Sequence, residues 1–145
     1  MMLIDGIASA TDLWVGTWKQ RFLDAGQIVD FQEAQIEYAV SRYLQPVLKV
    51  AKENNVRSAM ALAFMAACSV RGAQISLIIK VAKEKQIKLP FGSGDDERAC
   101  VDAIANGSGK VGEVNFDPDE SRRAKKLLLD DLGFLAEDLY DPATY

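Results

Sequence analysis

The chain has 145 residues and a formal net charge of −4, and its 49% hydrophobic and 26% charged residues are typical of a globular domain. Its balance of 17 basic and 21 acidic residues argues against a general nucleic-acid binder, which needs a basic face. The lack of histidine excludes Ser-His-Asp and Cys-His catalysis, and two cysteines are too few for a disulfide framework or a four-cysteine zinc site.

Residues 1–12 lack the basic and long apolar regions of a secretory signal, and no apolar run approaches the about 18 residues that span a bilayer. We therefore expect synthesis in the cytoplasm, no membrane partner, and a non-classical route for any export. Because histidine is missing and the acidic residues do not follow the spacing of a calcium loop, we expect no metal and no cofactor.

A first helix is expected from about Thr11 to Asp24, with Gly26 at its left-handed stop. Trp14 and Trp18 are four residues apart and therefore lie on one face of this helix. Two rings in this arrangement form either a sugar platform or part of a core. The core is favoured, because aromatic side chains dominate core burial.

A second helix follows, with Asp30 as its cap and Glu33 three positions later, as in a capping box. Pro46 cannot continue the hydrogen-bond ladder of a helix, so a kink or break is expected near Leu44–Gln45. A shorter helical segment then leads to a turn at residues 54–55, which are both asparagine.

The third helix organises the predicted fold. Ser58 caps it, and its body, Ala59–Val70, contains no charged residue. A helix that is apolar on all sides and too short for a membrane is the central helix of a globular core. Cys68 within it is expected to be a small buried hydrophobic residue. The sequence therefore predicts an all-α fold, a helical bundle around Ala59–Val70, as a single domain over residues 1–145.

The rest of the chain alternates amphipathic helices with loops, and no two-residue hairpin signal lies between alternating apolar runs. The loops are expected at residues 89–94 and 106–118. The helices are expected over Ala73–Gln86, over Asp96–Ala105 with Asp95 or Ser93 as cap, over Glu120–Leu132, and over Phe134–Leu139.

Several charged or glycine-rich patterns have plain structural explanations. Residues 107–112 match G-x-G-x-x-G, but no strand precedes them, so a flexible loop is expected rather than a nucleotide site. Acidic residues at 95–97 and 117–120 favour the dipole of the helix that each cluster precedes. Glu33 and Glu37 are expected to face solvent. The basic residues of 122–126 form a solvated face, from which one side chain could point inward to hold a carboxylate.

Four pieces of the chain resemble, in order, the family-46 chitosanases, which are glycosidases on the lysozyme-like scaffold. Residues 31–35, FQEAQ, resemble that family's Phe-x-x-Ala-Gln helix start, and Tyr43 with Pro46-Val47 resembles its Tyr-x-x-Pro-Ala-Val segment. The apolar helix ending in Arg71-Gly72 resembles a buried helix ending in His-Gly, and residues 94–97 resemble Gly-Gly-Asp-Glu. The resemblance implies a fold similar to the larger helical lobe of lysozyme-like glycosidases.

The resemblance covers the C-terminal half of that family only. The family's general acid and its partner carboxylate precede the Phe-x-x-Ala-Gln helix, in a segment that residues 1–30 do not match. Glycoside hydrolysis needs two carboxyls that flank the scissile bond, so the catalytic residues stay unknown and enzymatic activity stays open. The family's buried helix also carries an Asp that pairs with arginines. Ala66 takes its place here, so Arg122 is expected to be exposed or paired with another group.

The resemblance thus implies a chitosanase- or muramidase-like module associated with bacterial cell-wall glycan or a related amino-sugar polymer. Such a module either binds the glycan or completes a glycosidase site together with a partner chain or a missing N-terminal lobe. The expected glycan contacts are Trp14, Trp18, Tyr43 and Arg122. The alternative is a non-catalytic protein–protein interaction module of a larger assembly, such as a phage particle or a secretion system.

Overall fold

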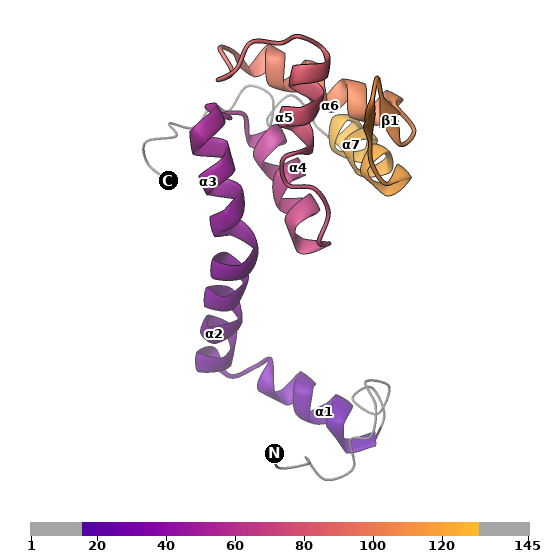
Figure 1. The fold of residues 1–145 in the computed structure, drawn as a ribbon. Helices are drawn as coiled ribbons and strands as arrows, with labels where there is room; N and C mark the ends of the chain where they lie inside the picture. The colour runs from indigo at the N-terminus through magenta and orange to yellow at the C-terminus, as the bar shows by residue number, and fades with distance from the viewer. Residues whose placement is uncertain (1–15, 131–145) are drawn as a thin grey trace, which may run out of the picture. The chain divides into compact units, whose positions relative to one another are not determined.

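The computed structural model describes residues 16–130, which are mostly helical (Figure 1). The all-α fold class is confirmed. The elements in chain order are α1 (Gly16–Ala25), α2 (Val29–Ala39), a π-helical segment (Val40–Leu44), α3 (Gln45–Asn54), α4 (Ala59–Val70), α5 (Leu77–Glu84), α6 (Gly94–Asn106), β1 (Lys110–Val111), β2 (Val114–Asn115) and α7 (Pro118–Asp130).

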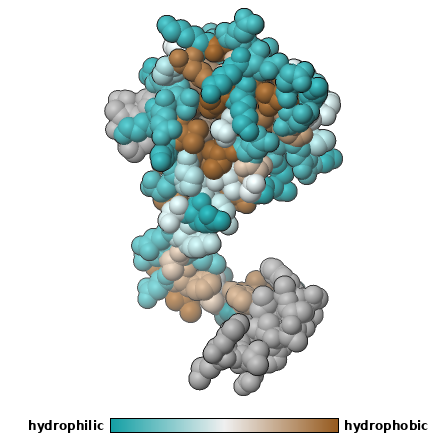
Figure 2. All heavy atoms as spheres, viewed as in Figure 1, coloured by the Kyte–Doolittle hydropathy of each residue, from teal (hydrophilic) through white to brown (hydrophobic). Residues whose placement is uncertain are grey.

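The chain divides into two compact units, Met1–Val40 and Ser41–Tyr145, each of which is described by itself. In the first unit, α1 ends at Ala25, and the amide of the next residue, Gly26, donates to the Phe22 carbonyl at 3.0 Å. The left-handed stop predicted at Gly26 is wrong, because the φ of this glycine is not in the left-handed region and the chain passes on through a further turn instead. The described part of α2 buries no residue, and Figure 2 shows hydrophobic surface over this helix. The single domain that the sequence predicts over residues 1–145 stays a prediction.

The predicted capping box of α2 is wrong. The helix begins at Val29, one residue before Asp30, and its N-cap, Ile28, makes no side-chain cap hydrogen bond. The Ile28 amide already donates to the Ala25 carbonyl in the turn that closes α1, so the chain enters α2 directly from that turn. Asp30 lies in the first turn, where its charge still favours the helix dipole.

In the second unit, the helix is irregular just before Pro46, at the position where the sequence predicts a kink or break. The π-helical segment ends at Leu44, whose φ of −85° and ψ of −44° are helical, and α3 follows at Gln45 with the proline in its first turn. The predicted disturbance near Leu44–Gln45 is therefore a π-helical segment and not a break in the helical backbone. The predicted turn also forms, because Asn55 ends α3 with a left-handed φ of 54°.

The predicted central helix is confirmed, and α4 has the bounds Ala59–Val70. The Ser58 hydroxyl caps it by accepting a hydrogen bond from the Ala61 amide at 3.2 Å. This helix contacts α3, α5, α6 and α7 of the second unit. Its buried side chains, which form the middle of the core, are Met60, Ala61, Phe64, Met65, Cys68 and Ser69.

The helix predicted over Ala73–Gln86 begins four residues late, at Leu77. Gly72 has a φ of +70°, and around it the Ala73 amide donates to the Cys68 carbonyl at 2.9 Å. This is the left-handed glycine closure of a helix C-terminus. Residues 73–76 reverse the chain after α4 and are therefore not available to α5.

The predicted loop at residues 106–118 contains a short hairpin that the sequence did not reveal. The strands pair antiparallel with Lys110 opposite Asn115 and Val111 opposite Val114. Strands of two residues are too short to produce a visible alternation. The glycines of the G-x-G-x-x-G pattern serve this hairpin: Gly112 has a φ of +55° in its turn, and a Cβ on Gly107 would lie 2.4 Å from the Lys110 carbonyl oxygen.

The helices on either side of the hairpin begin slightly earlier than expected. In α6 the Ser93 hydroxyl caps the helix by accepting from the Asp96 amide at 3.3 Å. The last helix begins at Pro118 rather than at residue 120. Gly133 and the short helix expected over Phe134–Leu139 lie outside the described residues.

Candidate functional site

A cleft of about 360 Å³ lies where the chain leaves α4 and where it enters α7. We call it the main cleft. The Gly72 reversal presents residues 71–74 on one side of it, and the start of α7 supplies the other side. The volume falls in the range of about 300–1,000 Å³ that ligand pockets have. The lining residues are Arg71, Gly72, Ala73, Gln74, Leu77, Phe116, Asp117, Asp119, Glu120 and Arg123.

A buried carboxylate, Glu120, lines the main cleft although it is only 2% exposed. Its Oε1 accepts a hydrogen bond from Arg123 Nη1 at 2.7 Å, and its Oε2 accepts one from the Cys68 thiol at 2.9 Å. Both carboxylate oxygens therefore have donors, which is what keeps a buried acid tolerable. Arg123 is thus the inward-pointing basic side chain that the sequence allowed for the cluster at 122–126.

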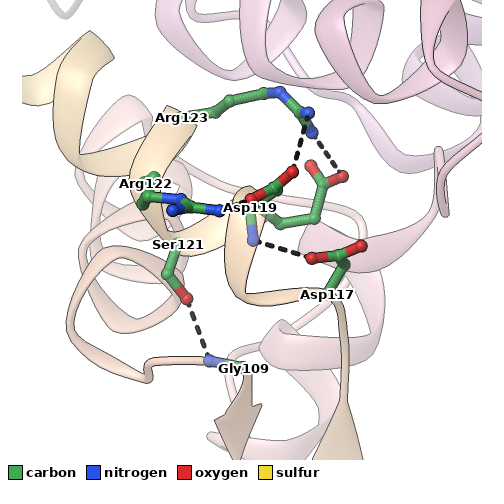
Figure 3. A network of polar contacts seen from close by, with 7 residues as sticks. Gly109, Asp117, Asp119, Ser121, Arg122 and Arg123 are labelled. Atoms are coloured by element: carbon green, nitrogen blue, oxygen red, sulfur yellow. Dashed lines mark hydrogen bonds and ion pairs between the residues drawn. The ribbon is translucent and has the colours of Figure 1, made fainter.

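The two other acids of the main cleft also have local partners (Figure 3). Asp117 Oδ1 accepts from the Asp119 amide at 2.8 Å and so caps the first turn of α7. Asp119 pairs with Arg122 on the same helix, and its second oxygen lies 4.0 Å from Arg123. Asp117 therefore serves the helix N-terminus, as expected, whereas Asp119 is bound to arginine side chains of the same helix.

Two further hollows adjoin the main cleft and share residues with it. The Tyr43 hollow, of about 540 Å³, lies between the start of α3 and the end of α4. The α7 hollow, of about 330 Å³, is lined by Arg71, Asp119, Arg122, Arg123 and Lys126. Arg71 lines all three spaces and is exposed. The Ser69 hydroxyl donates to the Tyr43 carbonyl at 2.7 Å, which joins the two sides of the Tyr43 hollow.

The structure brings some of the predicted glycan contacts near one another and leaves others undescribed. Tyr43 lines the Tyr43 hollow and Arg122 lines the α7 hollow, and the two spaces meet at Arg71. Arg122 is 78% exposed and paired with Asp119, as expected for an arginine without the family's buried acid. Trp14 lies outside the described residues, and Trp18 lies in α1 but its side chain is not described.

Sequence reasoning did not single out Arg71 or Glu120 as site residues. Arg71 follows directly on the apolar helix, so the end of that helix at Arg71-Gly72 was the available signal. No signal in the sequence marked Glu120, because an acid in the first turn of a helix is ordinarily solvated. Only the fold shows that Glu120 accepts a hydrogen bond from Cys68. Glu33 and Glu37 are exposed, as expected.

Both cysteines are buried and free. Burial is the largest cause that raises the pKa of the Cys68 thiol far above its ordinary value, and its hydrogen bond to Glu120 adds to this effect. Burial likewise raises the pKa of Cys100 from 9.0 to about 12, against the opposing charge of Lys85. Both groups are therefore neutral thiols near neutral pH, and neither is an activated nucleophile.

We expect both thiols to react with iodoacetamide at pH 8 more than about tenfold more slowly in the native protein than in urea. Fast alkylation of both in the native state would contradict their burial.

Because the pKa of Cys100 is 9.0 when unfolded and about 12 when folded, unfolding above pH 9 releases a proton. Its contribution to stability is thus complete below pH 9 and is lost as the pH rises toward 12. Urea titrations of Cys100→Ala beside the parent protein isolate this loss.

Within residues 16–130, no group of three or more histidine, cysteine, aspartate or glutamate side chains is arranged to hold a metal ion. No helix in the same part of the chain is both long and apolar enough to cross a bilayer.

Comparison with protein-family models, with curated proteins and with solved structures finds no match for this chain. The resemblance to the family-46 chitosanases is therefore neither supported nor excluded by relatives. Any function must be argued from the cleft and the surfaces of the chain itself.

Proposed function

We propose that the second unit binds an amino-sugar polymer, such as a bacterial cell-wall glycan, in the main cleft. The observation that carries this proposal is the composition of the cleft. Arg71 offers charged donors that can hydrogen-bond sugar hydroxyls, beside the apolar side chains of Leu77 and Phe116. Gln74 and Asp119 already have partners within the chain, but their oxygens have room for a further hydrogen bond to a sugar hydroxyl. The cleft also lies at Arg71-Gly72, one of the pieces that resemble the chitosanases.

The proposed role is binding without cleavage by this chain alone. Hydrolysis of a glycosidic bond needs two carboxyls on opposite sides of it, at least about 5 Å apart. The acids of the main cleft all come from residues 117–120, and each has a partner within the chain. Acids that follow one another at one helix start lie on one side of a ligand, so a second wall with its own acid would have to come from elsewhere.

Pull-down with purified cell walls tests the proposal, together with titration of an N-acetylglucosamine hexamer. We expect Arg71→Ala to weaken retention about tenfold, because an arginine contributes hydrogen bonds from a charged donor. Lys83→Ala is the matched control, since Lys83 is an exposed cation on α5 that does not line the cleft.

The protein alone is expected not to clear a cell-wall suspension. Clearing by the chain alone would overturn the non-catalytic part of the proposal. Failure of both wall and hexamer to bind would overturn the glycan-binding part.

A second function, a non-catalytic protein–protein interaction module, is favoured by the first unit. Its helix α2 and the turn before it expose large apolar side chains, with Ile36 and Tyr38 each 62% exposed and Ile28 and Val29 not far behind. Val29 and Ile36 are seven positions apart and therefore lie on one face of α2, and exposed apolar side chains that share a face are typical of surfaces that another protein covers. A chain that binds no glycan but scatters light with a mass well above 15.9 kDa would favour this second function.

A further inference from the structure

The Tyr43 hollow differs from the main cleft in its charge. It is lined by Arg42, Tyr43, Pro46, Ser69, Val70, Arg71, Gly72, Ala73 and Ile75, and none of these is acidic. Two arginines therefore face a space without a carboxylate, in a chain whose net charge is −4. All of these residues belong to the second unit.

Within the described residues, the side chains of the two arginines have no partner. The side chains of Arg42 and Arg71 make no hydrogen bond or ion pair with any residue between 16 and 130. In contrast, Arg122 and Arg123 are bound to Asp119 and Glu120. Arg71 also lines the main cleft beside Asp117, Asp119 and Glu120, but it is ion-paired with none of them. An arginine that is bound to no acid keeps its donors for a ligand, and its planar group matches a carboxylate with two parallel hydrogen bonds.

The remaining lining suits a sugar ring. Tyr43 and Pro46 supply flat apolar surface from one side of the hollow, and Ile75 supplies apolar surface from the other. Arg71, Gly72 and Ala73 line both this hollow and the main cleft, so one extended ligand can pass from the cleft into the hollow.

We infer that the Tyr43 hollow is a subsite for a carboxylate carried by the glycan, held between Arg42 and Arg71. The ligand class is therefore an acidic amino-sugar polymer rather than a neutral or cationic one. This inference rests on the proposed glycan-binding function and adds the charge of the ligand to it. A nucleic acid fits these observations less well, because a chain of net charge −4 offers two arginines here rather than a continuous basic face.

Arg42 gives the sharpest test because it lines the Tyr43 hollow and not the main cleft. Calorimetric titrations of the full chain compare three hexasaccharides of similar length: hyaluronan, which carries carboxylates, N-acetylglucosamine hexamer, which is neutral, and glucosamine hexamer, which is cationic. We expect hyaluronan to bind most tightly and its affinity to fall with added salt. Arg42→Ala should weaken hyaluronan binding about tenfold and leave the neutral hexamer unchanged.

Arg42→Lys should lose part of that affinity, because an ammonium keeps the charge without the two parallel hydrogen bonds. The matched control is Lys49→Ala, an exposed cation on α3 outside the hollow. Circular dichroism of each variant establishes that it is folded.

The outcomes separate the inference from the proposed function. If the neutral hexamer binds as tightly as hyaluronan and Arg42→Ala changes neither, the carboxylate subsite is overturned while glycan binding stands. If no hexasaccharide binds, the proposed function itself fails. Tighter binding of a single-stranded oligonucleotide than of hyaluronan would overturn the inference in favour of a nucleic-acid ligand.

Discussion

The Glu97→Ala variant is expected to lose about 3–5 kcal/mol of its free energy of unfolding. The Glu97 side chain is 1% exposed and lies beneath the N-terminus of α4. Its carboxylate accepts from the Arg57 and Ser58 amides, each at 2.8 Å, and from the Ser58 hydroxyl at 2.6 Å. Removing the carboxylate leaves the two buried Ser58 donors and the partly buried Arg57 amide without an acceptor at the start of the central helix, so the loss exceeds that of an ordinary cap. Urea unfolding followed by circular dichroism measures it.

Two variants control this result. Glu97→Gln keeps the shape of the side chain and one acceptor oxygen. Its NH2 group is a donor and replaces the second acceptor oxygen, so some of the donors lose their acceptor and an intermediate loss is expected. Asp95→Ala removes an exposed acid from the same first turn of α6 and is expected to change the free energy of unfolding by less than about 1 kcal/mol. Equal effects of Glu97→Ala and Asp95→Ala would mean that Glu97 acts only through the helix dipole.

The elements that local signals specify were predictable from sequence. The bounds of α4 follow from the charge-free run between Ser58 and Arg71, because the cap and the first polar residue lie at its two ends. Pro46 and Asn55 likewise act within one turn of themselves. In each case the residue that causes the feature is next to the feature.

The candidate site and the buried acids depend on contacts between residues far apart in the sequence, which local sequence patterns do not predict. Glu97 and Ser58 are 39 positions apart, and Glu120 and Cys68 are 52 apart, so neither acid could be distinguished in sequence from the solvated acids beside it. The hollows around Arg71 arise because Gly72 reverses the chain toward α7, and that reversal also shortened α5 from its predicted start. Long-range packing determines the buried acids, the hollows and the start of α5, and local propensity does not predict them.

The Glu120→Ala variant is expected to lose about 2–4 kcal/mol of its free energy of unfolding. The substitution leaves the Arg123 guanidinium, which is 20% exposed, without its 2.7 Å acceptor and leaves the Cys68 thiol without one. An arginine held in a partly desolvated position without its acid is costly. Replacing both partners, as Glu120→Leu with Arg123→Met, should restore most of the stability, because no uncompensated charge remains. Urea unfolding of Glu120→Leu, Arg123→Met and the double variant gives the coupling between the two positions.

Helix α7 supplies its own control for this prediction. Arg122 and Asp119 are also three positions apart, but their side chains are 78% and 41% exposed, so solvent screens the pair. Arg122→Ala should therefore cost less than about 1 kcal/mol. A double variant no more stable than Glu120→Ala would show that the loss comes from packing around Cys68 and not from the stranded charge of Arg123. The glutamate would then stabilise the fold mainly by filling space beside Cys68 in the lining of the main cleft, and not by neutralising Arg123.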